Sequence, residues 1–276
     1  MENDFRRNGL PKQTLNSNYS RIFYAILFGN KKNSIYLCGV KLTHIIMEEL
    51  KYHYKYPHPA VTADCVIFGF DGTKLNVLLV ERGIEPFKGK WALPGGFIWM
   101  DESALEGAKR ELEEETGLKD AYIRQFHTFS EPKRDPRERV ITIAYYALVR
   151  ISEVKGGDDA AKAQWFPLDQ VPALAFDHDK ILREAMTELR KQIHFEPIGF
   201  ELLPEKFTMK QLQHLYEAIL DVRFDRRNFY NKMLKLGLLT ELEEKIKLVN
   251  KKEAYLYKFN RENYDELKQK GFRLEF

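Results

Sequence analysis

Apolar residues recur along the middle of the chain in runs that predict a sheet covered by helices. The runs at residues 61–70 and 75–80 flank the turn signal Asp71-Gly72 and therefore predict a β-hairpin. The run at residues 140–149 is apolar at nearly every position, which is typical of a buried central strand. The other elements predicted in this region are strands at residues 122–129 and 164–166 and a helix at residues 179–193.

A further helix is predicted from capping residues at both of its ends. Ser103 followed by Glu106 is a capping box, and Gly117 occupies the position of a left-handed C-terminal cap. These signals place the helix at residues 103–116. The apolar stripe expected to pack on the core consists of Leu105, Ala108 and Leu112.

Glutamates crowd one side of this helix. Glu111 and Glu115 are four residues apart and share a face beside the apolar stripe, and Glu114 lies next to them. Carboxylates on one patch repel one another at neutral pH, so a divalent cation would stabilise them, and hard oxygen ligands favour Mg²⁺ or Mn²⁺. The alternative is a solvated face whose glutamates pair with Lys and Arg, and the helix by itself leaves both interpretations open.

The residues around the helix favour the metal site. The stretch from Gly96 to Leu118 resembles the signature of the Nudix hydrolase family at every fixed position and with the right gaps. The matching residues are Gly96, Glu102, Arg110, Glu111, Leu112, Glu114, Glu115, Gly117 and Leu118. The resemblance implies the Nudix fold, an α/β/α sandwich with a mixed sheet, and hydrolysis of a nucleoside diphosphate linked to another group.

The same resemblance implies roles for individual residues. Arg110 and Glu102 are expected to form an ion pair that orients the glutamates of the helix. The implied metal ligands are Glu111 and Glu115, assisted by Glu114 and the carbonyl of Gly96. These five side chains are the candidate catalytic residues, and Trp91, which opens the WALPGGF run before the helix, is a candidate substrate contact.

The loop SEPKRDPRERV carries a second set of candidates. On composition it is a solvated loop punctuated by prolines. It also resembles the RDPRGR element of ADP-ribose pyrophosphatase-like Nudix proteins, with Glu138 in place of the usual glycine. The resemblance makes Arg134 and Arg137 candidates for binding a diphosphate or a ribose phosphate, because planar guanidinium groups chelate phosphate oxygens.

A general base is expected on the loop that precedes the strand at residues 164–166. In the Nudix fold this loop reaches the metal site, and the candidates are Glu153, Asp158 and Asp159, among which the sequence does not choose. Downstream, Phe176 and His178 resemble the AFDH element of the same subgroup. We expect His178 to be a buried, hydrogen-bonded histidine.

The C-terminal region reads as helix, turn, helix and hairpin. Thr208 caps a predicted helix at residues 209–220, and Asp225 caps a second helix at residues 226–236 that ends at Gly237. Two short strands at residues 238–241 and 254–259 are expected to flank a loop with Lys245, Lys247, Lys251 and Lys252. This order is the winged-helix pattern, in which the second helix enters the major groove.

Winged helices bind either DNA or proteins, and both alternatives are open on the residues alone. The side chains expected to face DNA are Arg226, Arg227, Tyr230, Asn231 and Lys235, and those expected to face inward are Phe229, Met233 and Leu236. Over residues 57–270 the order of domains resembles the Nudix-related transcriptional regulators of NAD and sugar metabolism. The resemblance implies a homodimer that binds operator DNA and senses a nucleoside diphosphate sugar or a phosphorylated sugar.

Composition is consistent with two soluble domains. The chain has 276 residues, 44% of them hydrophobic, and carries about +5 over residues 1–46, about −5 over residues 47–200 and about +3 over residues 201–276. We place the domains at residues 47–198 (Nudix) and 199–276 (winged helix). Cys38 and Cys65, the only two cysteines, support neither a disulfide framework nor a zinc site, so a cytoplasmic protein without a membrane span is expected.

Two functional hypotheses follow from these features. The first is a Mg²⁺-dependent Nudix hydrolase acting on ADP-ribose or a similar molecule and coupled to transcription through the winged helix. The second is a metabolite-sensing transcriptional regulator with little or no hydrolase activity. The intact Nudix signature favours activity, whereas the order of the domains favours regulation.

The first 46 residues generate a prediction of their own. Met47 opens a stretch that resembles the start of related proteins, and the short apolar run at residues 22–28 is closed by Lys31 and Lys32, which disfavours a signal peptide. We therefore expect translation to start at Met47, with residues 1–46 an N-terminal extension that is poorly ordered or not made. Intact-mass measurement of the natively expressed protein tests this, and a product that begins at Met1 would contradict it.

Overall fold

The computed structural model describes residues 55–117, 121–151, 160–247 and 253–271, without the side chains at positions 115, 116, 160 and 161, and also the backbone of two short strands, β1 (Tyr36–Leu37) and β2 (Val40–Lys41). The chain divides into two compact units, Met1–His58 and Pro59–Phe276, and the functional residues lie in the second unit. Within the described ranges, no helix combines the length and the apolarity needed to cross a membrane.

The Nudix region is built on a mixed sheet with strand order β5-β4-β3-β8-β7, to which β6 adds by pairing with β3 and β9 by pairing with β4. Its strands are β3 (Ala60–Phe70), β4 (Leu75–Arg82), β5 (Trp91–Ala92), β6 (Gly95–Phe97), β7 (Tyr122–Phe129), β8 (Val140–Arg150) and β9 (Ala160–Pro167). β3 and β8 run parallel in continuous register, whereas the other pairs are antiparallel. The predicted hairpin is confirmed by the pairing of Phe70 with Leu75.

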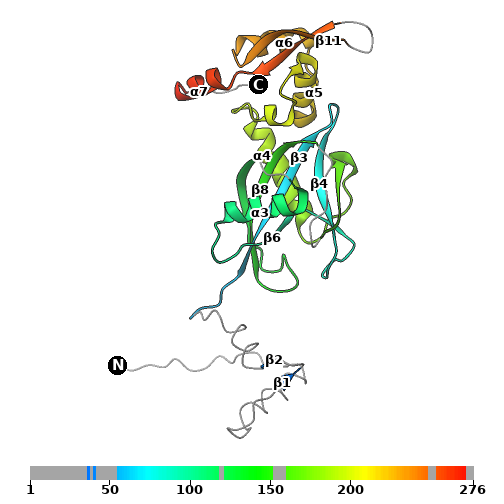
Figure 1. The fold of residues 1–276 in the computed structure, drawn as a ribbon, viewed down its shortest axis with the longest axis vertical. Helices are drawn as coiled ribbons and strands as arrows, with labels where there is room; N and C mark the ends of the chain where they lie inside the picture. The colour runs from blue at the N-terminus through cyan, green and yellow to red at the C-terminus, as the bar shows by residue number, and fades with distance from the viewer. Residues whose placement is uncertain are drawn as a thin grey trace, which may run out of the picture. The chain divides into compact units, whose positions relative to one another are not determined.

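Two helices cover opposite faces of this sheet, α3 (Ala104–Thr116) and α4 (His178–Gln192) (Figure 1). The alternation of side chains along β3 explains the two layers, because successive residues of a strand point to opposite faces. Cys65 and Ile67 share a core with Ala108 and Leu112 of α3, whereas Phe68 shares the other core with Ile181 of α4. The predicted α/β/α sandwich with a mixed sheet is therefore confirmed.

The caps of α3 are those predicted, but its apolar stripe differs at one position. The Ser103 hydroxyl accepts from the Glu106 N–H, and the Glu106 carboxylate accepts from the Ser103 N–H. Gly117 follows the helix with φ 74°. Leu105, expected in the core, is 42% exposed. Ala104 packs against the core instead, because the buried row follows the four-residue spacing from Ala104 through Ala108 to Leu112.

The C-terminal region forms a small winged helix, as predicted. Its elements are β10 (Phe207–Thr208), α5 (Met209–Leu220), α6 (Arg226–Lys235), β11 (Leu239–Lys247), β12 (Glu253–Phe259) and α7 (Arg261–Gln269), with strand order β10-β12-β11. Thr208 caps α5 through a capping box, Asp225 accepts from the Asn228 N–H at the start of α6, and Gly237 follows α6 with φ 69°.

The wing differs from the prediction in the length of its first strand. β11 continues past Glu241 to Lys247, so Lys245 and Lys247 lie in the strand rather than in a loop. The register of β11 against β12 shifts between Glu241 and Lys245. Beyond this shift β11 pairs with β12 again, with Lys245 opposite Tyr255. Lys251 and Lys252 lie outside the described residues.

The segment between the two regions is part of the core rather than an exposed linker. A 3₁₀ helix, η2 (Ile198–Leu202), buries Phe200, whose ring stacks on Phe259 of β12 at 4.3 Å between centroids. One hydrophobic cluster contains residues of the sheet, α4, η2, α5, α6 and β12. Arg150 at the end of β8 also donates from Nε to the Leu203 carbonyl at 2.7 Å. The Nudix region and the winged helix are therefore expected to unfold together.

Truncation of this junction gives a stability prediction. Phe200→Ala should lower the free energy of unfolding by about 3 kcal/mol or more, because it removes a buried ring from the shared core. Urea unfolding followed by circular dichroism measures the change. Phe195→Ala is the matched control, because Phe195 precedes η2 in the same segment but is 48% exposed. Equal losses for both variants would contradict a shared core at Phe200.

Candidate active site

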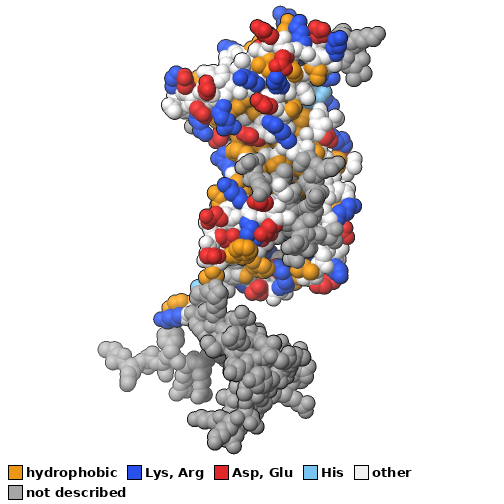
Figure 2. Space-filling model, viewed as in Figure 1, with side chains coloured by type: hydrophobic (Ala, Val, Ile, Leu, Met, Phe, Trp, Pro, Cys, Tyr) orange, Lys and Arg blue, Asp and Glu red, His pale blue; other side chains and the backbone are white. Residues whose placement is uncertain are grey.

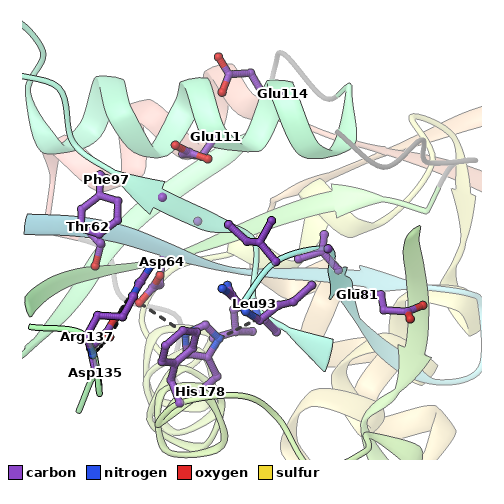
Figure 3. A pocket seen from close by; sticks show the side chains of 18 of the residues that line it. Thr62, Asp64, Glu81, Leu93, Phe97, Glu111, Glu114, Asp135, Arg137 and His178 are labelled. Atoms are coloured by element: carbon purple, nitrogen blue, oxygen red, sulfur yellow. Dashed lines mark hydrogen bonds and ion pairs between the residues drawn. The ribbon is translucent and has the colours of Figure 1, made fainter. Parts of the chain in front are cut away.

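A pocket of about 520 Å³ opens beside the start of β3, the end of β4 and the N-terminal half of the β6-to-α3 segment. Glu111 and Glu114 of α3 lie on one side of it, and Arg137, Asp135 and His178 lie across from them (Figure 3). The lining residues include Thr62, Asp64, Glu81, Arg82, Leu93, Gly96, Phe97, Trp99, Arg134 and Phe176. A carboxylate wall thus faces a wall that carries guanidinium groups.

Arg110 holds the carboxylate wall together. Its guanidinium binds Glu102 through two bonds, from Nε to Oε2 at 3.0 Å and from Nη2 to Oε1 at 2.7 Å. Nη1 donates to Glu111 Oε1 at 2.6 Å and to Glu114 Oε2 at 3.1 Å. The expected pair between Arg110 and Glu102 is present, and the same cation offsets the charge of both helix carboxylates.

The loop before α3 closes around this guanidinium. Nη2 of Arg110 also donates to the Phe97 carbonyl at 3.1 Å, and its Cζ lies 4.0 Å from the centre of the Trp99 ring. Glu102 accepts from the Trp99 N–H at 2.8 Å. Hydrogen bonding to Arg110 is the main reason that the pKa of Glu102 lies below its ordinary value, and hydrogen bonding to Glu102 raises the pKa of Arg110.

Gly96 leaves room for the carboxylate of Glu111 beside the loop. A Cβ at this position would lie 2.2 Å from Glu111 Oε1, closer than side chains pack. Burial raises the pKa of the Glu111 carboxyl, and the nearby Arg110 opposes that shift. A carboxylate that is costly to bury and lies against a glycine backbone is a suitable ligand for a hard cation.

The donors available to a metal ion are only partly described. Glu111 and Glu114 line the pocket, whereas the side chain of Glu115 lies outside the described residues. Among the described side chains, no group of three His, Cys, Asp or Glu residues is arranged as a metal site. Glu153, Asp158 and Asp159, the candidate bases, also lie outside the described residues.

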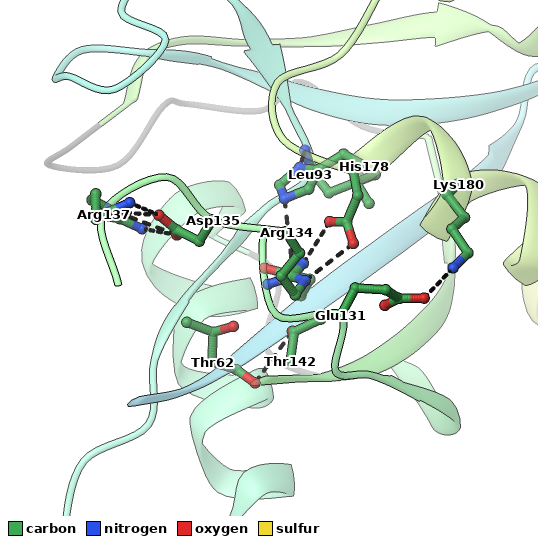
Figure 4. Close-up of polar contacts among 11 residues, drawn as sticks. Thr62, Leu93, Glu131, Arg134, Asp135, Arg137, Thr142, His178 and Lys180 are labelled. Carbon is green, nitrogen blue, oxygen red and sulfur yellow. Dashed lines mark hydrogen bonds and ion pairs between the residues drawn. The ribbon is translucent and has the colours of Figure 1, made fainter. Parts of the chain in front are cut away.

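The two candidate arginines of the β7-to-β8 loop have different surroundings (Figure 4). The side chain of Arg134 is 4% exposed. It binds both oxygens of Asp177, from Nη2 to Oδ1 at 2.7 Å and from Nε to Oδ2 at 3.1 Å. Its Nη2 also donates to Asp64 Oδ2 at 3.3 Å. Arg137 is 36% exposed, is held by Asp135 with Nη2 to Oδ2 at 2.7 Å, and lines the pocket. Arg137 is therefore better placed than Arg134 to contact a ligand.

His178 is buried and hydrogen-bonded, as expected. Its Nδ1 accepts from the Leu93 N–H at 2.9 Å, and its Nε2 lies 3.9 Å from Asp64 Oδ2. Burial lowers the pKa of His178, which favours the neutral ring. Because Nδ1 accepts a hydrogen bond, the proton of the neutral ring is on Nε2. Trp91 is not among the described residues that line this pocket; its ring packs edge-on against Phe166 at 4.7 Å.

The lining residues that were not singled out from the sequence include Asp64, Trp99 and Arg82. Asp64 is a carboxylate within an apolar strand, which is itself a signal, because a buried charge needs a partner. Trp99 is not among the matched positions of the Nudix signature, and Arg82 is the last residue of β4. Their positions depend on the fold, because their neighbours in the pocket come from other segments.

On the winged helix, most of the side chains expected to face DNA are exposed. Arg226, Arg227, Asn231 and Lys235 lie on the surface of α6. Tyr230 departs from the prediction: it is half-buried and its hydroxyl lies 3.4 Å from that of Tyr257. On the face shown in Figure 2, acidic and basic side chains are interspersed over this region.

Comparison with known proteins identifies both regions. A family model for the NUDIX domain matches residues 58–188, and the model for the NrtR DNA-binding winged helix domain matches residues 199–259. The chain is 44% identical over 139 residues to the ADP-ribose pyrophosphatase of Methanocaldococcus jannaschii, covering 50% of this chain and 79% of that protein.

Two relatives extend over both regions. The ADPR responsive transcriptional repressor NtrR of Acinetobacter baylyi is 34% identical over 215 residues, which cover 76% of this chain and 86% of that protein. The crystal structure of Shewanella oneidensis NrtR with a 27mer DNA superposes with a TM-score of 0.65 at 30% identity, covering 78% of this chain and 97% of that one. The chain therefore belongs to the family of regulators that join a Nudix domain to an NrtR-type DNA-binding winged helix domain.

Proposed function

We propose that this protein hydrolyses ADP-ribose or a similar nucleoside diphosphate sugar with a bound divalent cation, and that the winged helix couples the state of this site to operator DNA. The observation that carries the proposal is the Arg110 cluster, which binds Glu111 and Glu114 at the edge of a pocket that also contains Arg137, with Glu111 against Gly96. The likeness to an ADP-ribose pyrophosphatase supports the choice of substrate class.

The residues that would hold Mg²⁺ or Mn²⁺ are Glu111, Glu114 and Glu115, with the carbonyl of Gly96 as a further ligand. When bound, the metal ion would offset charge on the diphosphate and lower the pKa of a water molecule. Hard carboxylate oxygens suit such a cation. The bidentate bond to Glu102 fixes Arg110, and Nη1 of Arg110 orients Glu111 and Glu114 before the cation binds.

The chain's own groups have separate tasks in this reaction. Arg137 would bind the diphosphate, because Asp135 fixes its Nε edge and a guanidinium has further N–H donors to offer. A carboxylate from Glu153, Asp158 or Asp159 would take the proton of the attacking water. Water adds to phosphorus as the bridging P–O bond breaks, so ADP-ribose would give AMP and ribose 5-phosphate.

Regulation is the second proposed output of the same site. The exposed basic residues of α6 support binding in the major groove, and the repressor relative supports ADP-ribose as the signal. We propose that a homodimer presents two such helices to an operator. Under the alternative proposal the chain is a regulator in which occupancy of the pocket, rather than turnover, is the signal.

Loss of one helix carboxylate tests the hydrolase. Glu114→Gln should lower kcat for ADP-ribose with Mg²⁺ by about 100-fold, because it removes a metal ligand while keeping the shape of the side chain. Release of AMP, measured by chromatography, reports the rate, and EDTA should abolish it. Glu113→Gln removes the same charge one residue away on the exposed side of α3 and should retain activity. A wild-type protein that releases no AMP with Mg²⁺ would exclude the hydrolase.

Loss of two arginines tests the recognition helix. Arg226→Ala combined with Arg227→Ala should weaken binding to the DNA upstream of the chain's own gene and reduce the slope of log K against log salt by about 2, one per lost phosphate contact. Fluorescence anisotropy over a salt series measures both effects. The matched control is Arg183→Ala with Lys191→Ala, which removes two exposed cations from α4. If both double variants behave alike, α6 is not the DNA-reading element.

A further inference from the structure

Phe176, which lines the pocket, and Phe87, which packs against it, have a backbone conformation that aromatic residues rarely adopt. Phe176 has φ 55° and Phe87 has φ 66°, both in the left-handed region. Their rings meet edge to face, with centroids 4.9 Å apart. Such a conformation costs free energy, and it persists where the surrounding structure requires it, often at a ligand site.

Phe176 lies within reach of two guanidinium groups. Cζ of Arg82 is 4.8 Å from the centre of the Phe176 ring, and Cζ of Arg137 is 5.6 Å from it. All three residues line the pocket, although they come from three separate segments: the end of β4, the β7-to-β8 loop and the residue just before the cap of α4. The ring attracts both cations through its π face.

Both guanidinium groups are oriented by a further partner. Arg82 donates from Nε to the Pro86 carbonyl at 2.8 Å, and Asp135 binds the Nε edge of Arg137. Cζ of Arg137 also lies 5.3 Å from the centre of the Phe97 ring. Two like charges on one pocket wall repel each other. The contact of each guanidinium with the Phe176 ring, together with the Asp135 carboxylate on Arg137, offsets part of that cost.

We propose that Phe176 is a specificity-determining positioning residue that holds Arg82 and Arg137 as a pair of anion-binding groups for the diphosphate of an ADP-ribose-class ligand. This inference rests on the proposed function for the class of ligand and adds Arg82 and Phe176 to the site. Phe176 acts through the two arginines and not on the reacting atoms. A ligand with a single phosphate would engage the pair less fully than a diphosphate.

The alternative role for the Phe176 ring is to fill space in the core. The ring also packs against a small cluster of Val80, Ala92 and Ala175, so a large apolar side chain of another shape would partly fill that space. Asn and Gly both adopt the left-handed conformation readily, and therefore Phe176→Asn and Phe176→Gly remove the ring without straining the backbone. Loss of ligand affinity in a protein that keeps its fold then reports on the ring itself.

The experiment measures binding of α,β-methylene ADP-ribose to the full chain with Mg²⁺ by isothermal titration calorimetry. This analogue has a CH₂ group in place of the bridging oxygen, so the diphosphate is not cleaved. Phe176→Asn and Phe176→Gly should each raise Kd by about tenfold, and Arg82→Gln should do the same, whereas the loss for AMP should be about threefold or less. Phe176→Tyr keeps the ring and should bind the analogue like wild type.

Controls separate this inference from the proposed function. Arg183→Gln removes an exposed cation from α4 and should leave both affinities unchanged. If wild type binds the analogue and the ring-deleted variants bind it equally well, the role of Phe176 is refuted while the proposed ligand stands. If wild type fails to bind the analogue, the ligand class and the inference both fall. Where the Phe176 variants lack a cooperative thermal transition, Arg82→Gln carries the test, and equal losses for analogue and AMP would overturn the pairing.

Discussion

The site depends on the charge of Arg110. Three carboxylates, from Glu102, Glu111 and Glu114, converge on one guanidinium that is 16% exposed. Without a cation these groups would repel one another, and the loop from Gly96 to Ser103 would lose the bonds that fold it back onto α3. The pair with Glu102 is bidentate, so the helix carboxylates are oriented before any metal ion binds. The ring of Trp99 adds a cation–π contact, with its centre 4.0 Å from Cζ of the guanidinium.

Strand β3 supplies both the core and one wall of the pocket. Val66 and Phe68 fill the core on the α4 side, and Asp64, on the same face two residues before Val66, instead points a buried carboxylate toward Arg134 and His178. A single face of one strand therefore changes from apolar packing to a polar network over a few residues. Asp177 binds Arg134 from the other side, so the start of α4 is attached to the pocket wall.

Local signals were the most reliable guide to this fold, because the helix caps at Ser103 and Thr208 and the hairpin depend only on residues close in sequence. The expectation failed where distant contacts decide. Leu105 is exposed because the core favours the Ala104 row, and β11 extends because β12 lies beside its charged residues. Arg134 matched a motif, yet its partners Asp177 and Asp64 are 43 and 70 residues away in sequence, so its burial could not be derived from the loop alone. Helix α7 was not predicted, since it buries little besides Tyr264.

The junction offers a physical link between the two proposed outputs. Phe200 stacks on Phe259 of the wing, and Arg190 of α4 donates from Nε to the Ile219 carbonyl of α5 at 2.9 Å. α4 begins beside Asp177 and His178 at the pocket and continues to Arg190 at the winged helix, so one rigid element touches both. A ligand that prefers one position of α4 would bias the winged helix by that difference in affinity, with no need for turnover. Under the proposed function, hydrolysis would then end the signal by removing the ligand, and the two proposed activities would be parts of one cycle.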